Sequence, residues 1–420
     1  MADDAGRVLI VGAGQAGATA AALLRQYGWT GSITLVGAEA ASPYQRPPLS
    51  KAWLAGTATD ADLRLRAPGF YAEQRIDLRT GVRVEAIDRA GRAAILADGT
   101  RLPYDRLILA TGCAPRRLAL PGMDLPGVLE LRTQDDATRL RAALSPGARL
   151  AVIGGGYVGL EVAATAVRLG LAVTVIEREA RLLARVASPE LAAYIHAAHA
   201  AAGVAIRLSA DVASLDGAGL DGAALDGAGD RVAGVRLGDG TVVACDATLV
   251  GVGAVPCDAL ARGCDLACDN GIVVDAACRT DDPAIQAIGD CTRRPLPLYA
   301  TTGRLESVPN ATEQAKQAAA ALCGRPPPPP EVPWFWSDQY DLRIQIAGLP
   351  VGAVPRIVRQ TAGAFSVAHL DAGDRLVTIE TVNAVTDFAA GRMIIGRRRR
   401  LDPARLADPA CPLAQTMLPE

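Results

Sequence analysis

Two short glycine-rich segments have the spacing of phosphate-binding turns. The first is Gly12-Ala-Gly14-Gln-Ala16-Gly17, and the second is Gly154-Gly-Gly156-Tyr157-Val158-Gly159. In such a turn the first glycine permits a tight bend, the second lets the backbone approach a pyrophosphate, and the third lets the next helix pack closely. The N-terminus of that helix then faces the phosphate. The spacing therefore predicts two dinucleotide-binding sites in one chain.

An acid after the second strand of each unit would accept hydrogen bonds from ribose hydroxyl groups. Glu177 ends the strand that follows the second turn. A carboxylate there repels a 2′-phosphate and favours NADH over NADPH. Arg178 and Arg181 follow it, and an arginine can bind a 2′-phosphate, so the preference stays open. In the first unit the strand ends at Gly37, and Glu39 is either the ribose acceptor or a solvated surface residue.

Two dinucleotide sites limit the chemistry that the chain can perform. One site would hold a tightly bound redox cofactor, and the other would bind a diffusible electron donor. A flavin beside a nicotinamide allows hydride transfer through the flavin N5 atom.

The elements around these motifs predict how they are positioned. A buried strand over residues 7–12, a helix over 16–26 and a strand over 32–37 form one β-turn-α-β unit, and residues 149–179 repeat the pattern. Five prolines at 326–330 end this part of the chain. Alternating strand patterns follow, which indicate a third, smaller domain. We therefore predict an α/β fold with two Rossmann-like dinucleotide-binding domains and an α+β C-terminal domain.

Bulk properties exclude several classes of function. The 420 residues are 50% hydrophobic and 21% charged with a net charge of -2, which is not typical of a nucleic-acid binder. The first residues lack the pattern of a signal peptide, and no run of about 18 apolar residues predicts a membrane-spanning helix. The nine cysteines form no C-x-x-C pair. A cytoplasmic protein with free thiols is expected.

Further motifs resemble those of flavoproteins with two dinucleotide-binding domains. The segment Thr280–Asp290 resembles their second FAD motif, in which the aspartate binds the ribityl chain, and Ala110-Thr111-Gly112 resembles their A-T-G element. Three segments are similar to the FAD-dependent NADH:ferredoxin reductases of oxygenase systems and their rubredoxin-reductase relatives. They are Arg46-Pro-Pro-Leu-Ser-Lys51, Arg304-Leu-Glu-Ser-Val-Pro-Asn310 and Pro333-Trp-Phe-Trp-Ser-Asp-Gln339, and the likeness extends over essentially the whole chain.

This resemblance implies domain boundaries and a set of binding residues. Residues 1–114 and 249–326 would form a glutathione-reductase-like FAD domain, 115–248 the NADH domain and 331–420 the interface domain. FAD would be bound tightly but non-covalently, and NADH would be a substrate. The implied FAD residues are Gly12, Gly14, Ala16, Gly17, Glu39, Arg46, Lys51, Val82, Ala110, Thr111, Gly112, Arg132, Asp290, Val308 and Trp336. The implied NADH residues are Gly154, Gly156, Tyr157, Val158, Gly159, Glu161, Glu177, Arg185 and Gly253.

The resemblance also implies four catalytic residues. Lys51, one of only two lysines beside 41 arginines, would lie near flavin N5 and pair with Glu161. A cation there would stabilise the electron-rich reduced flavin. Tyr157 would lie over the nicotinamide face, and Trp336 near the flavin and the docking surface. Alternatively, Lys51 is a surface residue and Tyr157, Trp334 and Trp336 are packing residues.

Residues that are missing exclude related activities. No cysteine precedes Cys113, so the dithiol of disulfide reductases is absent, and Cys264 and Cys268 are interpreted as ordinary thiols. His369 is expected to lack the glutamate partner used for acid–base chemistry. His196 and His199 could share a helix face, but without a third ligand we expect no metal site. No four-cysteine spacing is present, so an iron–sulfur cluster would belong to a partner.

The partner surface is the part that the sequence describes least well. A basic rim would steer an acidic ferredoxin, and the candidates are Arg64, Arg66, Arg304, Lys316 and Arg343, with the run Arg397–Arg400 as a further one. Each is alternatively a plain surface residue. Segment 299–303 departs from the family pattern. The repeats at 215–230 are interpreted as a flexible hairpin insertion rather than a calcium site.

The resulting hypothesis is an NADH-dependent reductase that delivers single electrons to a [2Fe-2S] ferredoxin serving a cytochrome P450 or a Rieske oxygenase. It would be a monomer or a weak homodimer that binds neither nucleic acid nor membrane. The alternatives are a reductase with another acceptor (rubredoxin, quinone, monodehydroascorbate or oxygen) and a signalling flavoprotein resembling apoptosis-inducing factor.

Overall fold

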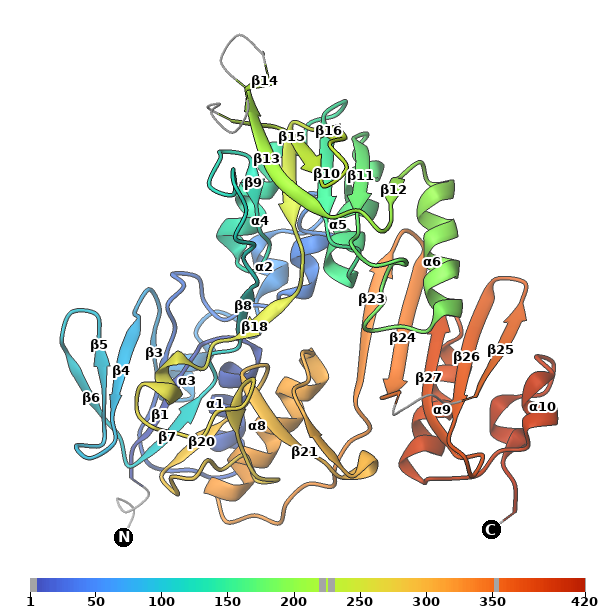
Figure 1. Cartoon of the computed structure of the whole chain (residues 1–420). Helices are drawn as coiled ribbons and strands as arrows, with labels where there is room; N and C mark the ends of the chain where they lie inside the picture. Colours follow the sequence, from blue (N-terminus) through green and yellow to red (C-terminus); the bar gives the residue numbers. More distant parts are fainter. Residues whose placement is uncertain (1–5, 219–223, 226–230, 351–354, 420) are drawn as a thin grey trace. The chain divides into compact units, whose positions relative to one another are not determined.

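The computed structural model describes residues 6–218, 224–225, 231–350 and 355–419 (Figure 1). Most of the 215–230 repeat and the first five residues lie outside the described part. The chain divides into two compact units. The first unit comprises Met1–Gln45, Ala61–Ala114 and Val255–Phe335, and the second comprises Arg46–Asp60, Pro115–Ala254 and Trp336–Glu420.

A five-stranded parallel sheet forms the centre of the first unit. Its strand order is β20 (Ile285–Ala287), β7 (Arg106–Leu109), β1 (Val8–Val11), β2 (Ile33–Val36) and β3 (Ile76–Arg79). Every residue of β1 is buried, as expected for a central parallel strand. Helix α1 (Gln15–Gln26) connects β1 to β2, so its N-terminus lies at the carboxyl end of β1.

Helices cover one face of this sheet and smaller strands the other. Helix α8 (Val308–Leu322) packs along α1 through alanines and Leu24 (Figure 1). The opposite core contains Leu107, Tyr104 and Leu266 together with residues of an antiparallel three-stranded sheet. That sheet comprises β4 (Val84–Asp88), β5 (Ala93–Leu96) and β6 (Arg101–Pro103). The remaining elements are α3 (Phe70–Glu73), α7 (Ala259–Arg262), β19 (Ile272–Val273), β21 (Thr292–Leu296), η2 (Pro297–Tyr299) and β22 (Thr301–Gly303).

The second unit repeats the parallel arrangement around the second glycine-rich turn. The sheet contains β12 (Ala205–Arg207), β11 (Ala172–Ile176), β10 (Arg149–Ile153), β17 (Ala247–Val250) and β9 (Val128–Leu129), in this order. Its helices are α4 (Gln134–Ala143), α5 (Tyr157–Arg168) and α6 (Pro189–Ala201). An antiparallel sheet of β14 (Ala224–Leu225), β13 (Val212–Ala218), β15 (Arg231–Leu237) and β16 (Val242–Ala244) contributes to its core.

The C-terminal part of the second unit is an antiparallel sheet with helices. The strands are β23 (Trp334–Gln339), β24 (Leu342–Gly348), β27 (Leu376–Val382), β26 (Ala364–Leu370) and β25 (Arg356–Thr361), in sheet order. Helix α9 (Val385–Gly396) packs on β27, and α10 (Pro403–Ala407) and η3 (Leu413–Thr416) follow. Buried Arg359 donates to the carbonyl groups of Leu406, Asp408 and Cys411, which holds the tail against β25.

The predicted fold class is confirmed, because two parallel nucleotide-binding sheets precede an antiparallel C-terminal domain. The polypeptide crosses from one unit to the other just before η1 (Pro47–Ser50) and at the start of α2 (Asp60–Leu63). It crosses again within β8 (Cys113–Pro115), β18 (Ala254–Pro256) and β23. The domain boundaries proposed from the sequence remain predictions. Among the described residues, no helix is long and apolar enough to cross a membrane.

Candidate functional site

The first glycine-rich turn leaves its backbone open toward a ligand. Gly12 has φ +114°, and a Cβ there would collide with the carbonyl oxygen of Ala110, while a Cβ on Gly17 would collide with that of Gly12. Gly14 differs, because a Cβ on it would meet nothing within 4 Å. Gly14 is also the N-cap of α1 and provides no side-chain cap. The turn therefore presents uncapped helix N–H groups to open space, which fits the pyrophosphate of FAD.

The Gly-Asp element lies beside this turn. A Cβ on Gly289, which has φ +84°, would come within 3.0 Å of the Ala16 Cβ in α1. The next residue, Asp290, accepts a hydrogen bond from the Cys113 thiol at 3.4 Å. The Thr111 hydroxyl donates to the carbonyl oxygen of Cys257 at 2.6 Å. The predicted FAD residues around Ala110–Gly112 and Asp290 thus come together beyond the carboxyl ends of the parallel strands β7 and β20.

Gly37 directly follows the last residue of β2, close to the strand end predicted from the sequence. A Cβ there would come 2.6 Å from the Ala13 Cβ, so the glycine-rich turn leaves no room for a side chain. Glu39 lies two residues further on and accepts a hydrogen bond from the Tyr44 hydroxyl at 2.5 Å. The half-buried Val82 donates its N–H to the carbonyl oxygen of Gly37. Glu39 and Val82 are therefore both near the strand end at which a ribose is expected.

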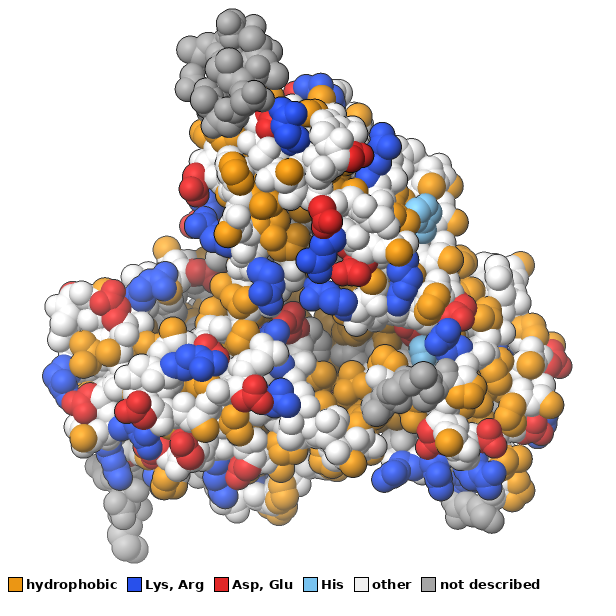
Figure 2. All heavy atoms as spheres, in the orientation of Figure 1, with side chains coloured by type: hydrophobic (Ala, Val, Ile, Leu, Met, Phe, Trp, Pro, Cys, Tyr) orange, Lys and Arg blue, Asp and Glu red, His pale blue; other side chains and the backbone are white. Residues whose placement is uncertain are grey.

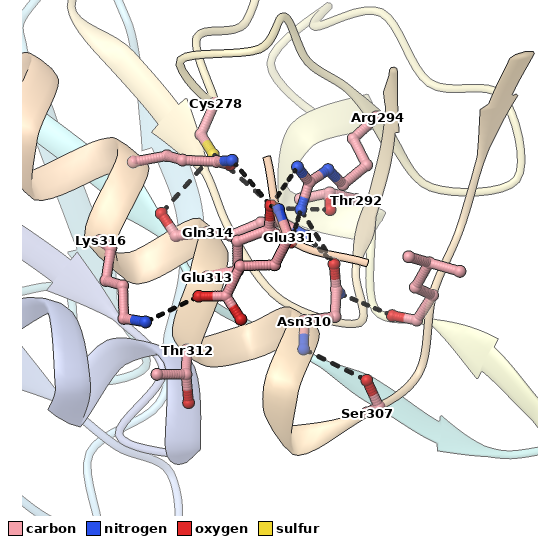
Figure 3. A network of polar contacts seen from close by, with 12 residues as sticks. Cys278, Thr292, Arg294, Ser307, Asn310, Thr312, Glu313, Gln314, Lys316 and Glu331 are labelled. Atoms are coloured by element: carbon pink, nitrogen blue, oxygen red, sulfur yellow. Dashed lines mark hydrogen bonds and ion pairs between the residues drawn. The ribbon is translucent and has the colours of Figure 1, made fainter. Parts of the chain in front are cut away.

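A buried polar cluster fixes the start of α8, which contains Val308. Arg294 forms a 3.0 Å ion pair with Glu313 and donates to Asn310 at 3.2 Å, and Ser307 caps the helix (Figure 3). Gln314 connects Asn310 to Thr292. Removing an ion pair from water is costly unless further hydrogen bonds satisfy it, and here they do. The cluster holds α8 rigidly against β21 and keeps Val308 in place.

The second glycine-rich turn has the geometry of the first. Gly154 has φ +104°, and a Cβ there would lie 2.5 Å from the Gly251 carbonyl oxygen, while one on Gly159 would lie 2.6 Å from that of Gly154. Gly156 caps α5 without a side chain. Val158 is exposed in the first turn of α5. This turn also fits the pyrophosphate of a dinucleotide.

Glu177 lies directly against this turn. Its carboxylate accepts hydrogen bonds from the N–H groups of Gly155 at 2.7 Å and Glu179 at 2.8 Å. The two arginines considered for NADPH are occupied elsewhere: Arg178 pairs with Glu179, and Arg181 donates to four carbonyl groups of its own loop. A Cβ added to Gly253 would lie 3.2 Å from the Arg185 guanidinium group, so these two residues are close neighbours. The structure therefore places a carboxylate beside the turn, at the position where the sequence predicted a ribose acceptor.

Lys51 and Glu161 form an ion pair within the second unit. The Lys51 Nζ lies 2.8 Å from the Glu161 Oε2, and the side chains are 19% and 6% exposed. Ser50 and Ser337 donate to the same carboxylate at 2.5 and 2.6 Å. Three donors compensate the burial of the carboxylate. In the same unit the Arg46 guanidinium donates to the carbonyl oxygen of Arg132 at 2.5 Å.

The predicted aromatic residues lie on α5 and β23. Trp334 and Trp336 are both partly buried and lie two residues apart on β23. Tyr157 starts α5, and burial, followed by the charge of Glu380, raises its pKa well above the usual value. Glu380 corrects one expectation: His369 was predicted to lack an acidic partner, but its Nε2 lies 3.2 Å from the Glu380 Oε2. The two residues are eleven positions apart, and the antiparallel pairing of β26 with β27 brings them together.

The candidate docking residues fall into two groups. Arg64, Arg66 and Arg343 are exposed. Arg304 pairs with Glu306, and Lys316 pairs with Glu331 at 2.8 Å, so both cations are partly neutralised within the chain. Figure 2 shows further positively charged side chains gathered near the C-terminus, where Arg397, Arg398 and Arg400 are exposed.

The nine cysteine side chains are buried or half-buried. All nine are free. Burial raises the pKa of Cys278 to about 12 and that of Cys291 to about 11, which suppresses the reactive thiolate. In the described part of the chain, no group of three or more His, Cys, Asp or Glu residues could hold a metal ion.

Several polar residues at the ion pair were missed by sequence reasoning. Ser50, Ser337, Gln339 and His199 all belong to the hydrogen-bonded surroundings of Glu161. Ser50 could have been suspected as the neighbour of Lys51. The others come from distant segments and have no local signal.

Comparisons with known proteins agree over the whole chain. Residues 6–315 match the family described as pyridine nucleotide-disulphide oxidoreductase, and residues 334–417 match the reductase C-terminal family. A probable ferredoxin reductase, CtmF, of Castellaniella defragrans is 50% identical over 96% of this chain and 97% of its own. Putidaredoxin reductase CamA of Pseudomonas putida is 43% identical over 97% and 96%. The crystal structure of the covalent putidaredoxin reductase–putidaredoxin complex matches with a TM-score of 0.93 and 42% identity, covering 98% of both chains.

Proposed function

Because the chain belongs to the pyridine nucleotide-disulphide oxidoreductase family, among its ferredoxin reductases, we propose that it passes single electrons from NADH to a [2Fe-2S] ferredoxin that serves a cytochrome P450 or a Rieske oxygenase. The chain is an FAD-containing, NADH-using oxidoreductase. The proposal depends most on the likeness, C-terminal domain included, to a reductase solved in complex with its partner protein. Free thiols support a cytoplasmic location, which stays a proposal.

FAD, when bound, supplies the conversion between a two-electron hydride donor and one-electron acceptors. The proposed task of the first unit is to hold it. The N-terminus of α1 with Gly12, Gly14, Ala16 and Gly17 would bind the pyrophosphate, and Asp290 the ribityl chain. Glu39, Val82, Ala110–Gly112 and Val308 are proposed as further contacts. Arg46, Lys51, Arg132 and Trp336 are proposed as FAD residues from the family resemblance.

The proposed task of the second unit is to bind and orient NADH. The N-terminus of α5 with Gly154, Gly156, Val158 and Gly159 would bind the pyrophosphate, and Glu177 would accept hydrogen bonds from the ribose. Arg185 and Gly253 would complete the site, with Tyr157 over the nicotinamide face. Such positioning accounts for much of the rate in hydride transfer.

Lys51 and Glu161 are proposed to tune the reacting centre. The ammonium group would stabilise negative charge that develops on the cofactor, and Glu161 would hold that ammonium in a single position. The exposed Arg64, Arg66 and Arg343, with Arg304 and Lys316 at partly neutralised positions, are proposed to steer an acidic partner.

Stopped-flow mixing of the NADH-reduced protein with candidate acceptors tests the function. We expect rapid electron transfer to at least one [2Fe-2S] ferredoxin, with a rate that falls as ionic strength rises. Rapid turnover on rubredoxin, a quinone or oxygen, with slow transfer to every [2Fe-2S] ferredoxin tried, would reject the proposed acceptor while leaving the NADH chemistry intact.

A further inference from the structure

A chain of hydrogen bonds leads away from Glu161 into the second unit. The Ser337 Oγ lies 2.6 Å from the Glu161 Oε1, and the Gln339 Nε2 lies 3.1 Å from the Ser337 Oγ. The Gln339 Oε1 lies 2.8 Å from the His199 Nε2. The Tyr340 hydroxyl lies 3.1 Å from the His199 Nδ1. The chain therefore connects helix α5, strand β23 and helix α6, and we name it the His199–Glu161 chain.

The charge on Glu161 gives this chain one direction. A carboxylate has no proton to donate, so the single hydroxyl hydrogen of Ser337 points to Glu161. The Ser337 oxygen must then accept from Gln339, which turns the Gln339 carbonyl oxygen toward His199. That oxygen can only accept, and the His199 Nε2 must therefore bear the ring proton. The Nδ1 atom is left to accept from Tyr340.

The surroundings keep His199 neutral. His199, Ser337 and Gln339 are 0%, 0% and 1% exposed. Burial lowers the pKa of His199, while its hydrogen bond to the Gln339 carbonyl oxygen opposes the shift and the charge of His196 adds to it. Burial raises the pKa of Tyr340 to about 12, so its hydroxyl keeps its proton, and the Arg168 guanidinium lies 5.7 Å over its ring.

We propose that Ser337, Gln339 and His199 are positioning residues for Glu161, and that the charge on Glu161 determines which ring nitrogen of His199 bears the proton. The chain holds the carboxylate in the orientation that pairs with Lys51. Its connection to hydride transfer rests on the proposed role of the Lys51–Glu161 pair. The proton position itself does not depend on any electron acceptor.

In Glu161→Gln, donors and acceptors should exchange roles along the His199–Glu161 chain. The ammonium group of Lys51 and the Ser50 hydroxyl need an acceptor, so the amide oxygen of the new side chain faces them and its NH₂ group faces Ser337. Ser337 then donates to the carbonyl oxygen of a rotated Gln339. The Gln339 NH₂ group next donates to the His199 Nε2, which moves the ring proton to Nδ1. The resulting bond runs from Nδ1–H to the Tyr340 oxygen.

The protein has only three histidines. Nitrogen NMR of FAD-loaded protein with labelled histidine therefore shows directly which ring nitrogen of His199 bears the proton. His199→Gln identifies the signal. We expect the Nε2–H tautomer in the natural sequence and the Nδ1–H tautomer in Glu161→Gln, with His196 and His369 unchanged. An Nδ1–H tautomer in the unaltered protein, or an Nε2–H tautomer in Glu161→Gln, would overturn the proposal.

Ser337→Ala provides the matched control, since it removes one buried hydroxyl and interrupts the chain. In this background Glu161→Gln should no longer move the proton on His199. A reversal that persists without Ser337 would show that the two sites communicate by another route and would reject the chain.

A kinetic measurement tests whether the His199–Glu161 chain affects reduction by NADH. Ser337→Ala should slow reduction by NADH about tenfold, since a hydrogen bond to a charged group is lost, while the Kd of NADH stays unchanged. Ser337→Thr should restore the rate, because it returns the hydroxyl. An equal rate in Ser337→Ala, or a slow rate in both variants, would contradict a positioning role. None of these measurements uses a ferredoxin, so they stand apart from the test of the acceptor.

Discussion

The Glu177 carboxylate rests against the second glycine-rich turn and accepts the N–H of Gly155 at 2.7 Å. The corresponding place in the first unit is taken by Gly37, whose Cβ position lies 2.6 Å from the Ala13 Cβ. The two dinucleotide sites therefore differ in the residue that ends the second strand. Only the second site presents a carboxylate at that position, and this difference supports a distinct nucleotide at each.

Glu177→Ala should weaken NADH binding about 10- to 100-fold and reduce the preference over NADPH, because a charged ribose acceptor is lost. Titration of both nucleotides measures the change. The control is Glu179→Ala, which removes an exposed carboxylate of the same turn that pairs with Arg178. A preference for NADH that survives in Glu177→Ala would mean that the acid is misassigned.

Lys51→Met should slow reduction by NADH about 10- to 100-fold, since a preorganised cation at a reacting centre is removed. Rapid-mixing absorbance measures the rate. Lys316→Met is a matched control: it removes the only other lysine, which forms a half-exposed pair with Glu331. Equal rates in the two variants would exclude Lys51 from the reaction.

Gly14→Ala should fold normally yet lose FAD. Its backbone angle φ is −81° and the added Cβ meets no protein atom within 4 Å, but it would occupy the space proposed for the pyrophosphate. FAD retention after gel filtration, with circular dichroism to report the fold, measures the outcome. Gly238→Ala, at a turn with only ordinary contacts near 3.8 Å, should keep its FAD. Full FAD retention in Gly14→Ala would place the pyrophosphate elsewhere.

Arg294→Met should lower the free energy of unfolding by about 3–5 kcal/mol, because Glu313 would remain buried without its cation. Both side chains are less than a tenth exposed. Chemical denaturation of the FAD-loaded protein measures the loss. The control Glu331→Gln breaks the half-exposed pair with Lys316 and should cost about 1 kcal/mol or less. Similar losses in both variants would contradict this description of the cluster in Figure 3.

His199 should make stability depend on pH. Burial lowers its pKa below the ordinary value of 6.5, so below that pH the unfolded chain binds a proton that the folded chain does not. Stability therefore falls as pH drops below about 6.5 and recovers above it. Denaturation at pH 5.5 and 7.5 should show a smaller drop in His199→Gln, by up to about 1.4 kcal/mol. The control His196→Gln should keep most of the drop, because burial is the larger cause of the shift and the charge of His196 is a smaller one. Equal drops in the unaltered protein and in His199→Gln would refute the assignment.

Local sequence was sufficient for features that depend on neighbouring residues. The two glycine-rich turns were predicted because a tight bend, an uncapped helix and a buried strand are encoded within a few positions. Gly37 and Glu177 were assigned to the ends of their strands by counting, and the structure places them directly after β2 and β11. The paired Lys51 and Glu161 were predicted from family resemblance, not from spacing.

Tertiary structure alone decided what surrounds those residues. Ser337 and Gln339 look like ordinary strand residues, and only the packing of β23 brings them to Glu161 and His199. His369 was expected to lack an acidic partner, yet the sheet pairs β26 with β27 and brings Glu380 to it. Hydrogen bonds are short-ranged and directional, so the partners of Ser337 and Gln339, more than a hundred residues away, leave no local pattern. The sequence by itself determined the cofactor-binding turns, and the folded chain determined the polar contacts that hold the reactive pair in place.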